Sequence, residues 1–198
     1  MSLDLIYNGE FFSQEEPILS INNRAFRYGD GLFESIRIVN GETYNFSAHY
    51  SRFFEGMKTL KMDIPEYFTK TYFENQIKSL IQRNGIHQGG RVKLTIYRKG
   101  EVASYYSETN EPGYIIEAEP FPSNEFVLNA EGIDIDIYNE HQKPTTDFSA
   151  FKTTNSYFYV HAIISGKEKG LSDMLLVNEK NNIIESTNSN FFIVSNGV

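Results

Sequence analysis

The fold is decided by the stretch LFESIRIVNGETYNF, residues 32–46. Residues 32–39 have the composition of a strand, Asn40-Gly41 is the strongest short-range signal for a tight turn, and residues 42–46 return as a second strand. A similar pattern precedes it, with strands at 3–7 and 10–12 around Asn8-Gly9. The first part of the chain is therefore predicted to hold β-hairpins.

Two helices are expected after the second hairpin. Ser47 is the predicted N-cap of the first, because apolar residues recur at helical spacing over 50–60. The second is predicted to begin at Glu66, after Pro65, and to close at Asn84-Gly85. Both helices carry apolar stripes, so each is expected to pack against a sheet.

The next strand, residues 91–98, alternates strictly, and residues 113–118 form a further predicted strand. One face carries Val92, Leu94 and Ile96, and the other carries Arg91, Lys93, Thr95 and Tyr97. Residues 119–124 contain two prolines, which favour neither helix nor sheet, and are predicted to be a linker.

The second half begins with isoleucines at 133, 135 and 137 that alternate with aspartates. A helix is predicted over 155–169, ending at Gly170, and strands at 173–177, 183–184 and 191–194. The elements do not alternate as in a Rossmann sheet, so the predicted class is α+β. The predicted domains are 1–118 and 125–198, joined by the linker 119–124.

Composition excludes several classes of function. The net charge is −8 and the basic residues are scattered, which argues against nucleic acid as a partner. The absence of cysteine excludes disulfides and thiolate metal sites and suits a cytoplasmic protein. No apolar run approaches the ~18 residues of a membrane helix, no signal peptide is evident, and the four histidines lack metal-site spacing, so no metal is expected.

Lys152 follows the apolar residues Ala150 and Phe151. A lysine is ordinarily a solvated surface residue, and this is the default interpretation of Lys152. In a desolvated setting its pKa falls and its amine becomes a nucleophile or forms a Schiff base. Phosphate-binding loops and G-x-S-x-G motifs are absent from the sequence.

Three stretches in order change this weighing: RAFRYGDGLFESIR at 24–37, HYSRF at 49–53, and the run from 152 to 194 that contains KTTN, DMLLVN and ESTNSNFFIV. Together they resemble the class IV aminotransferases, the fold type IV enzymes that use pyridoxal 5'-phosphate. The resemblance implies a two-domain fold. Its N-terminal domain would be an α/β sandwich, and its C-terminal domain a sheet or pseudo-barrel that is truncated here.

The resemblance also implies roles at the cofactor. Lys152 matches the lysine that forms the Schiff base, Arg52 the arginine that holds the phosphate, and Glu185 the carboxylate that faces the pyridine nitrogen and keeps it protonated. Tyr157 matches a tyrosine that hydrogen-bonds the phenolic oxygen of the cofactor. Without the motif, each would be taken as a solvated or packing residue.

A turn and a substrate wall complete the predicted site. The turn residues that approach the phosphate are Asn188, Ser189 and Asn190. The substrate side is formed by Tyr28, Phe33, Ser35, Lys93, Tyr97 and Tyr105, with Lys93 opposite a substrate carboxylate. An ordinary solvated strand face is the alternative for Lys93 and Tyr97.

Three activities compete within the family, and the lyase is narrowly the favoured prediction. Lys93, Tyr105 and the spacing from Lys152 to Asn155 favour 4-amino-4-deoxychorismate lyase, which forms p-aminobenzoate and pyruvate. Tyr157 instead favours an aminotransferase acting on branched-chain or D-amino acids with 2-oxoglutarate, although the 101–106 loop lacks the Arg-x-His element of the D-amino-acid enzymes.

The family is homodimeric, and its members continue beyond the point where this chain ends. That departure leaves a non-catalytic scaffold or dimerisation protein as a third hypothesis.

Overall fold

A computed structural model describes residues 2–100 and 104–196 and divides the chain into two compact units. Unit 1 comprises Met1–Phe126 and Phe148–Asn155, and unit 2 comprises Val127–Asp147 and Ser156–Val198. The sequence predicted one crossing between the two parts, at the linker 119–124. In the structure the chain also returns to unit 1 over Phe148–Asn155. Lys152 therefore belongs to unit 1, whereas Glu185 belongs to unit 2.

Unit 1 is built on a six-stranded antiparallel sheet with the strand order β2-β1-β6-β5-β3-β4. The strands are β1 (Asp4–Tyr7), β2 (Glu10–Ser13), β3 (Gly31–Val39), β4 (Glu42–Thr43), β5 (Gly90–Arg98) and β6 (Pro112–Pro120). Both predicted hairpins are present. Strand β6 runs to Pro120, beyond the predicted start of the linker, because a proline at the last position of a strand breaks few ladder bonds.

Three helices belong to unit 1: α1 (Arg24–Tyr28), α2 (Phe46–Thr59) and α3 (Lys70–Arg83). The short α1 was not predicted. The predicted helix starts were wrong: Asn45, in the left-handed conformation, precedes α2, and Thr69 caps α3 by accepting a 3.1 Å bond from the Tyr72 N–H. The threonine satisfies one of the first free N–H groups of α3.

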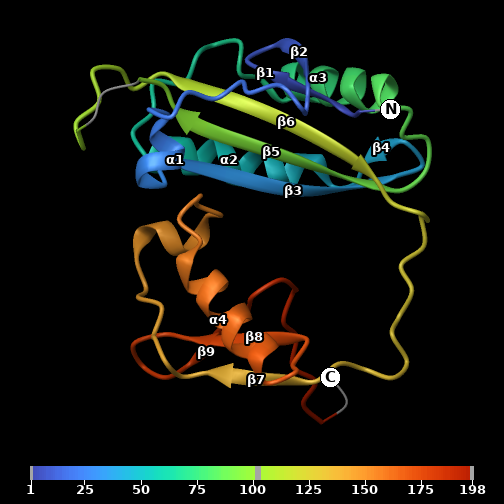
Figure 1. Ribbon diagram of the computed structural model, residues 1–198, viewed down its shortest axis with the longest axis vertical. Coiled ribbons are helices and arrows are strands. Elements are labelled where there is room, and N and C mark those ends of the chain that lie inside the picture. The colour runs from blue at the N-terminus through green and yellow to red at the C-terminus, as the bar shows by residue number, and fades with distance from the viewer. Residues whose placement is uncertain (1, 101–103, 197–198) are drawn as a thin grey trace. The chain divides into compact units, whose positions relative to one another are not determined.

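Helices α2 and α3 pack against one face of the sheet (Figure 1). The side chains that alternate onto this face are fully buried, as Ile36, Val92 and Leu94 illustrate. They pack against a cluster of aromatic rings. In this cluster Phe73 lies edge-on to Phe53, Phe68 and Tyr114, with ring centres 5.0 to 5.3 Å apart. The opposite strand positions face away from these helices, and Ser35 and Lys93 among them are exposed.

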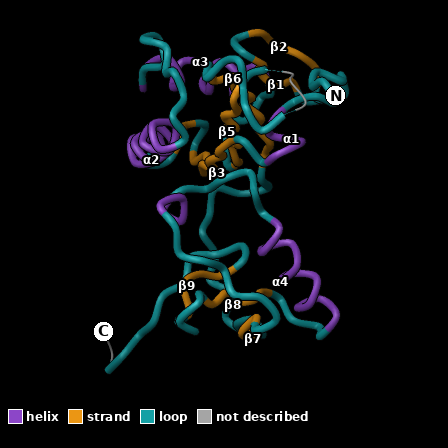
Figure 2. The backbone as a smooth tube through the Cα atoms, turned by 90° about the vertical axis from the view of Figure 1, so that its left-hand side faces the viewer, coloured by secondary structure: helices purple, strands orange, loops and turns teal. Residues whose placement is uncertain are grey.

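Unit 2 holds a smaller sheet of strands β7 (Ile135–Tyr138), β8 (Asp173–Val177) and β9 (Ile183–Ser186). Strand β7 pairs parallel to β8, and β9 pairs antiparallel to it. Helix α4 (Tyr157–Glu168) lies beside β7 and β8 (Figure 2), and the 3-10 helix η1 (Asp147–Ala150) leads back to unit 1. The core is small: Tyr138, Ala162, Met174 and Leu176.

The strand predicted at 191–194 was wrong. Residues 191–194 form no strand in the structure, and Phe192, Ile193 and Val194 are largely exposed. A short apolar run has the composition of a strand, but it becomes one only when a neighbouring strand offers hydrogen bonds. Among residues 2–100 and 104–196, no helix is long and apolar enough to cross a membrane.

Candidate functional site

Lys152 is held at the edge of β3 by backbone hydrogen bonds. The Phe33 N–H donates to the Lys152 carbonyl at 2.8 Å, and the Thr154 N–H donates to the Gly31 carbonyl at 2.9 Å. The Lys152 side chain is exposed, and its Nζ lies 5.7 Å from the centre of the Phe33 ring. The backbone is thus fixed within unit 1, while the amine remains accessible beside an aromatic wall.

Phe151 anchors the same segment in the core of unit 1, where it reaches helix α2 at Gly56. A Cβ atom on Gly56 would lie 3.2 Å from Phe151 Cδ1 and 2.7 Å from Leu32 Cδ1, so only glycine fits there without displacement. Arg52 precedes Gly56 by one turn on the same side of the helix. Close packing at Gly56 therefore sets the helix that carries Arg52 against the segment that carries Lys152.

Glu34 holds the Arg52 guanidinium by a two-pronged ion pair. Arg52 Nε and Nη2 lie 2.6 and 2.5 Å from Glu34 Oε1 and Oε2, and His49 Nδ1 lies 2.8 Å from Oε2. The Glu34 side chain is 1% exposed and the Arg52 side chain 39% exposed. A fork of this kind fixes the guanidinium plane more firmly than a single bond would.

Burial opposes ionisation of Glu34, but the hydrogen bonds and charges of Arg52 and His49 outweigh it and hold the pKa of this carboxyl below its ordinary value. The bond to Glu34 raises the pKa of Arg52. The pair is therefore fully charged at neutral pH. The accessible part of the guanidinium is left to meet an anion.

The open face of the sheet carries Ser35 and Lys93, which lie directly opposite each other across β3 and β5. Lys93 is half exposed, and its Nζ lies 3.9 Å from Glu117 Oε2 on β6. Tyr97 departs from the expected polar face: it is buried and stacked on Tyr7. Burial, together with a hydrogen bond involving Tyr7, raises the pKa of the Tyr97 hydroxyl.

Tyr28 and Tyr105 are brought together, with ring centres 5.3 Å apart. Arg24, which is buried, holds this arrangement: its Nη1 and Nη2 donate to the carbonyls of Ser104 and Tyr105 at 2.9 and 2.8 Å. Its Nε is paired with Asp30 at 2.9 Å. Residues 101–103 of the same predicted loop lie outside the described residues.

Glu185, in unit 2, accepts from Lys143, whose Nζ lies 2.5 Å from Oε1. The same Nζ lies 2.6 Å from the hydroxyl oxygen of Tyr159. Tyr157 makes a different contact: it is half exposed, and its ring packs on Phe158 at 4.1 Å. The tyrosine bonded to Lys143 beside Glu185 is thus Tyr159, and the contact of Tyr157 with the cofactor stays a prediction.

The turn after β9 is tied together by its own hydroxyls. The Ser189 N–H donates to Ser186 Oγ at 2.8 Å, and Ser186 Oγ donates to the Ser189 carbonyl at 2.6 Å. Buried Asp173 accepts from the hydroxyl and N–H of Thr187. Burial of Asp173 opposes its ionisation, but these bonds outweigh it and lower its pKa. Asn188 and Asn190 are exposed beside this rigid turn.

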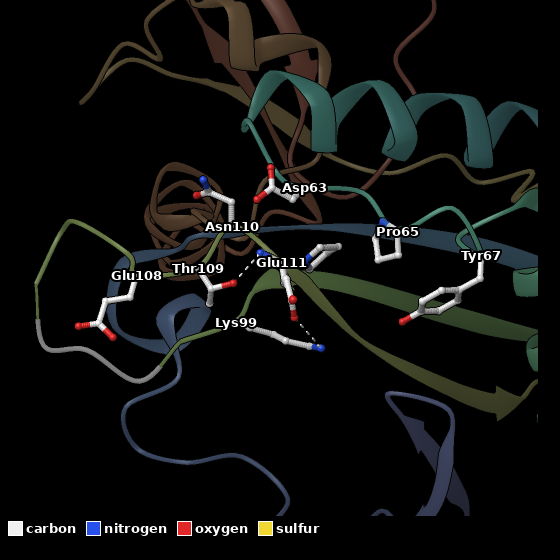
Figure 3. A pocket seen from close by; sticks show the side chains of 9 residues that line it. Asp63, Pro65, Tyr67, Lys99, Glu108, Thr109, Asn110 and Glu111 are labelled. Carbon is white, nitrogen blue, oxygen red and sulfur yellow. Dashed lines mark hydrogen bonds and ion pairs between the residues drawn. The ribbon is translucent and has the colours of Figure 1, made fainter.

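A hollow of about 490 Å³ in unit 1 lies apart from the predicted residues. Its walls carry Asp63, Glu108, Glu111 and Lys99 (Figure 3). No predicted site residue lines it, and carboxylates outnumber its single lysine. Within the described ranges, no group of three histidine or acidic residues is placed to hold a metal ion.

Sequence reasoning did not assign a function to Glu34, Lys143 or Tyr159. Glu34 carries a signal that was available: it alternates with Leu32 and Ile36 on the apolar side of a strand, and a charge in that position is buried only when it is paired. Lys143 is 42 residues from Glu185 in the sequence, and no local pattern links the two.

Comparison with known proteins identifies the family. The class IV amino-transferase model matches residues 31–198, so the chain belongs to the class IV aminotransferases, a family of pyridoxal-phosphate-dependent enzymes. A Methanocaldococcus jannaschii protein, provisionally described as a branched-chain-amino-acid aminotransferase, is 26% identical over 99% of this chain and 67% of its own length. D-alanine aminotransferase of Staphylococcus aureus is 34% identical over 43% of this chain and 29% of its own length.

Solved structures show the same fold. Branched-chain aminotransferase of Thermoproteus uzoniensis, with norvaline, has a TM-score of 0.85 and 21% identity over all of this chain and 67% of its own. The branched-chain amino acid aminotransferase of Escherichia coli gives 0.79 and 15%, covering 94% of this chain and 62% of its own. A Legionella pneumophila protein provisionally described as 4-amino-4-deoxychorismate lyase gives 0.75 and 18%, covering 88% and 62%. The chain thus spans about two thirds of these relatives' length, and the predicted α+β class is confirmed.

Proposed function

We propose that the protein is an aminotransferase that binds pyridoxal 5'-phosphate through Lys152 and acts on an amino acid with an apolar side chain. The observation that carries the substrate class is the wall beside the Lys152 amine. Phe33 flanks that amine. Thr95 lies opposite Phe33, and Ile115 lies opposite Thr95 on the next strand. Such a wall favours an apolar substrate side chain.

The side chains present fit the cofactor, because each chemical group that it requires is supplied by an anchored residue. Lys152 offers an accessible primary amine on a fixed backbone. Arg52 offers a guanidinium that Glu34 holds in plane, and Glu185 offers a carboxylate that is 37% exposed. Arg52 would hold the phosphate, and Glu185 would hold the proton on the ring nitrogen.

When bound, pyridoxal phosphate supplies an electron sink for the substrate's α-carbon. The residues of this chain then divide the remaining work. The Lys152 amine moves the proton at the α-carbon. The backbone bonds from Phe33 to Lys152 and from Thr154 to Gly31 fix the segment that carries this amine. Tyr157, Asn188, Ser189 and Asn190 remain predicted cofactor contacts, and Tyr28 and Tyr105 predicted substrate contacts.

A second candidate is the 4-amino-4-deoxychorismate lyase activity. It is favoured by Lys93, which lies opposite Ser35 on the open face and would meet a substrate carboxylate there. Glu117 neutralises part of that charge. We therefore rank this activity below amino transfer. Homodimerisation and a cytoplasmic location remain predictions, and light scattering on the purified protein tests the first.

The decisive experiment identifies the amine and then the substrate. Borohydride reduction of the protein mixed with pyridoxal phosphate, followed by peptide mapping, is expected to label Lys152. Labelling elsewhere, or none, would contradict the proposal. Amino transfer from branched-chain amino acids and from D-alanine to 2-oxoglutarate is then compared with pyruvate release from aminodeoxychorismate. Pyruvate release without amino transfer would favour the lyase.

A further inference from the structure

A second amine lies beside the carboxylate assigned to the cofactor ring. Lys143 follows β7 in unit 2, and its N–H donates to the Val177 carbonyl at 2.9 Å. Its side chain then turns inward: Nζ lies 2.5 Å from Glu185 Oε1 and 2.6 Å from the Tyr159 hydroxyl. It also lies 4.8 Å from the centre of the Tyr159 ring. All three residues belong to one compact unit.

This lysine is not a solvated surface residue, because its side chain is only 16% exposed. An ammonium that loses most of its water must be paired and hydrogen-bonded, and Glu185 and Tyr159 supply both. Burial lowers the pKa of Lys143, but the bonds to Glu185 and Tyr159 outweigh it, so the pKa rises. Lys143 is therefore charged at neutral pH and is not a free amine that would compete with Lys152.

We propose that Lys143 and Tyr159 are positioning residues that fix the Glu185 carboxylate for the ring nitrogen of pyridoxal phosphate. The inference rests on the proposed function. Lys143 engages Oε1, which anchors one end of the carboxylate that would accept from the ring N–H. Without the ammonium, a carboxylate that is more than one third exposed would turn to water and lose its fixed orientation.

The test is a double-mutant cycle on cofactor affinity. Pyridoxal phosphate is titrated into wild type, K143M, E185Q and K143M/E185Q. We expect K143M to weaken binding about tenfold, and to weaken it less than about twofold when Glu185 is already Gln, because a residue that acts through Glu185 has nothing left to position. K143R, which keeps the charge, is expected to restore most of the affinity.

A matched control and a second readout separate positioning from folding. Lys169 pairs with Asp136 at 3.5 Å in the same unit, but half of its side chain is exposed. K169M is therefore expected to bind the cofactor as wild type does. The visible absorption band of the bound cofactor, recorded at saturation, is expected to shift in K143M and not in K169M, whereas a loss of stability alone would leave the band of the folded protein unmoved. Y159F, which removes only the hydroxyl, is expected to weaken binding less than K143M.

Three outcomes would overturn the inference: K143M that binds as wild type does, an effect of K143M that is equal in both backgrounds, or a folded K143R that fails to rescue binding. Each would show that Lys143 does not act through Glu185. Wild type that took up no pyridoxal phosphate would overturn the proposed function and this inference together. Wild type labelled at Lys152, with K143M unaffected, would overturn this inference alone.

Discussion

Unit 1 and unit 2 both pack helices on a sheet, but the apolar side chains of their strands are not buried to the same degree: β8 of unit 2 is buried throughout, whereas β7 is not. In unit 1, α2 and α3 cover a six-stranded sheet, and Ile36, Val92 and Ile96 have no exposed surface. In unit 2, α4 packs on β7 and β8 of a three-stranded sheet, and Ile135 and Ile137 on β7 are still 44% and 36% exposed. Strand pattern alone does not bury a side chain; a second layer has to cover it. Unit 1 is therefore expected to carry most of the stability of the described chain.

The largest effect is expected from Phe73→Ala. Phe73 is fully buried among Phe53, Phe68 and Tyr114, so its removal leaves a cavity and costs about 3–5 kcal/mol. Hydrogen exchange followed by mass spectrometry reports the loss of protection segment by segment. We expect the loss to extend over β5, β6 and α3. Unchanged protection in these elements would break the contrast between the units.

Glu34→Gln is expected to cost about 2 kcal/mol at pH 7, because it removes a buried charge that Arg52 and His49 require. The pKa of Glu34 is lowered on folding, so its contribution is present above the unfolded value of 4.5 and is lost as the pH falls through the folded value. The free energies of unfolding of wild type and E34Q, measured with urea, should therefore converge as the pH falls through the lowered folded-state pKa of Glu34. The exposed ion pair between Lys93 and Glu117 offers a control. Glu117→Gln is expected to lower the free energy of unfolding by less than about 0.5 kcal/mol.

Two glycines sharpen the comparison further. Gly56→Ala in α2 places a methyl group against Leu32 and Phe151 and is expected to cost about 1–2 kcal/mol. Gly166→Ala in α4 meets the flexible Met174 side chain, which can move, and the better helix propensity of alanine offsets the contact. Urea midpoints should fall for G56A and stay near wild type for G166A. Borohydride labelling of Lys152 should also fall in G56A, because Phe151 precedes it directly.

The smallest effect is expected from Ile135→Thr. Threonine keeps the β-branched shape that suits a strand, and the side chain it replaces is nearly half exposed, so we expect a change under about 0.5 kcal/mol. The matched variant in unit 1, Ile36→Thr, places a hydroxyl in a fully buried position and is expected to cost about 2–3 kcal/mol. Similar losses for the two variants would show that the isoleucines of β7 are covered in solution.

The predictions from sequence succeeded where neighbouring residues carry the information. Asn8-Gly9 and Asn40-Gly41 correctly predicted the two hairpins. The alternation over residues 92–96 correctly predicted that Val92, Leu94 and Ile96 are buried. They failed at helix starts, where α3 begins at Lys70 rather than Glu66, and at 191–194, where no strand forms. In each case the outcome depends on which backbone donors and acceptors find partners.

The candidate site divides along the same line. Resemblance selected Arg52, Lys152 and Glu185 from residue order alone, and the family assignment is confirmed. The resemblance did not predict the ion-pair partners of Arg52 and Glu185. Glu34 meets Arg52 across 18 residues of sequence, and Lys143 meets Glu185 across 42.

The sequence by itself determined the family, the hairpins and the lysine expected to carry the cofactor, because these depend on local spacing and on motifs that stay in order along the chain. Only the tertiary structure decided that Phe148–Asn155 returns to unit 1, that Glu34 orients Arg52, and that Lys143 pairs with Glu185. The two ion pairs form because a buried charge is stable only with a partner, and the fold, not the distance along the sequence, decides which residue that partner is.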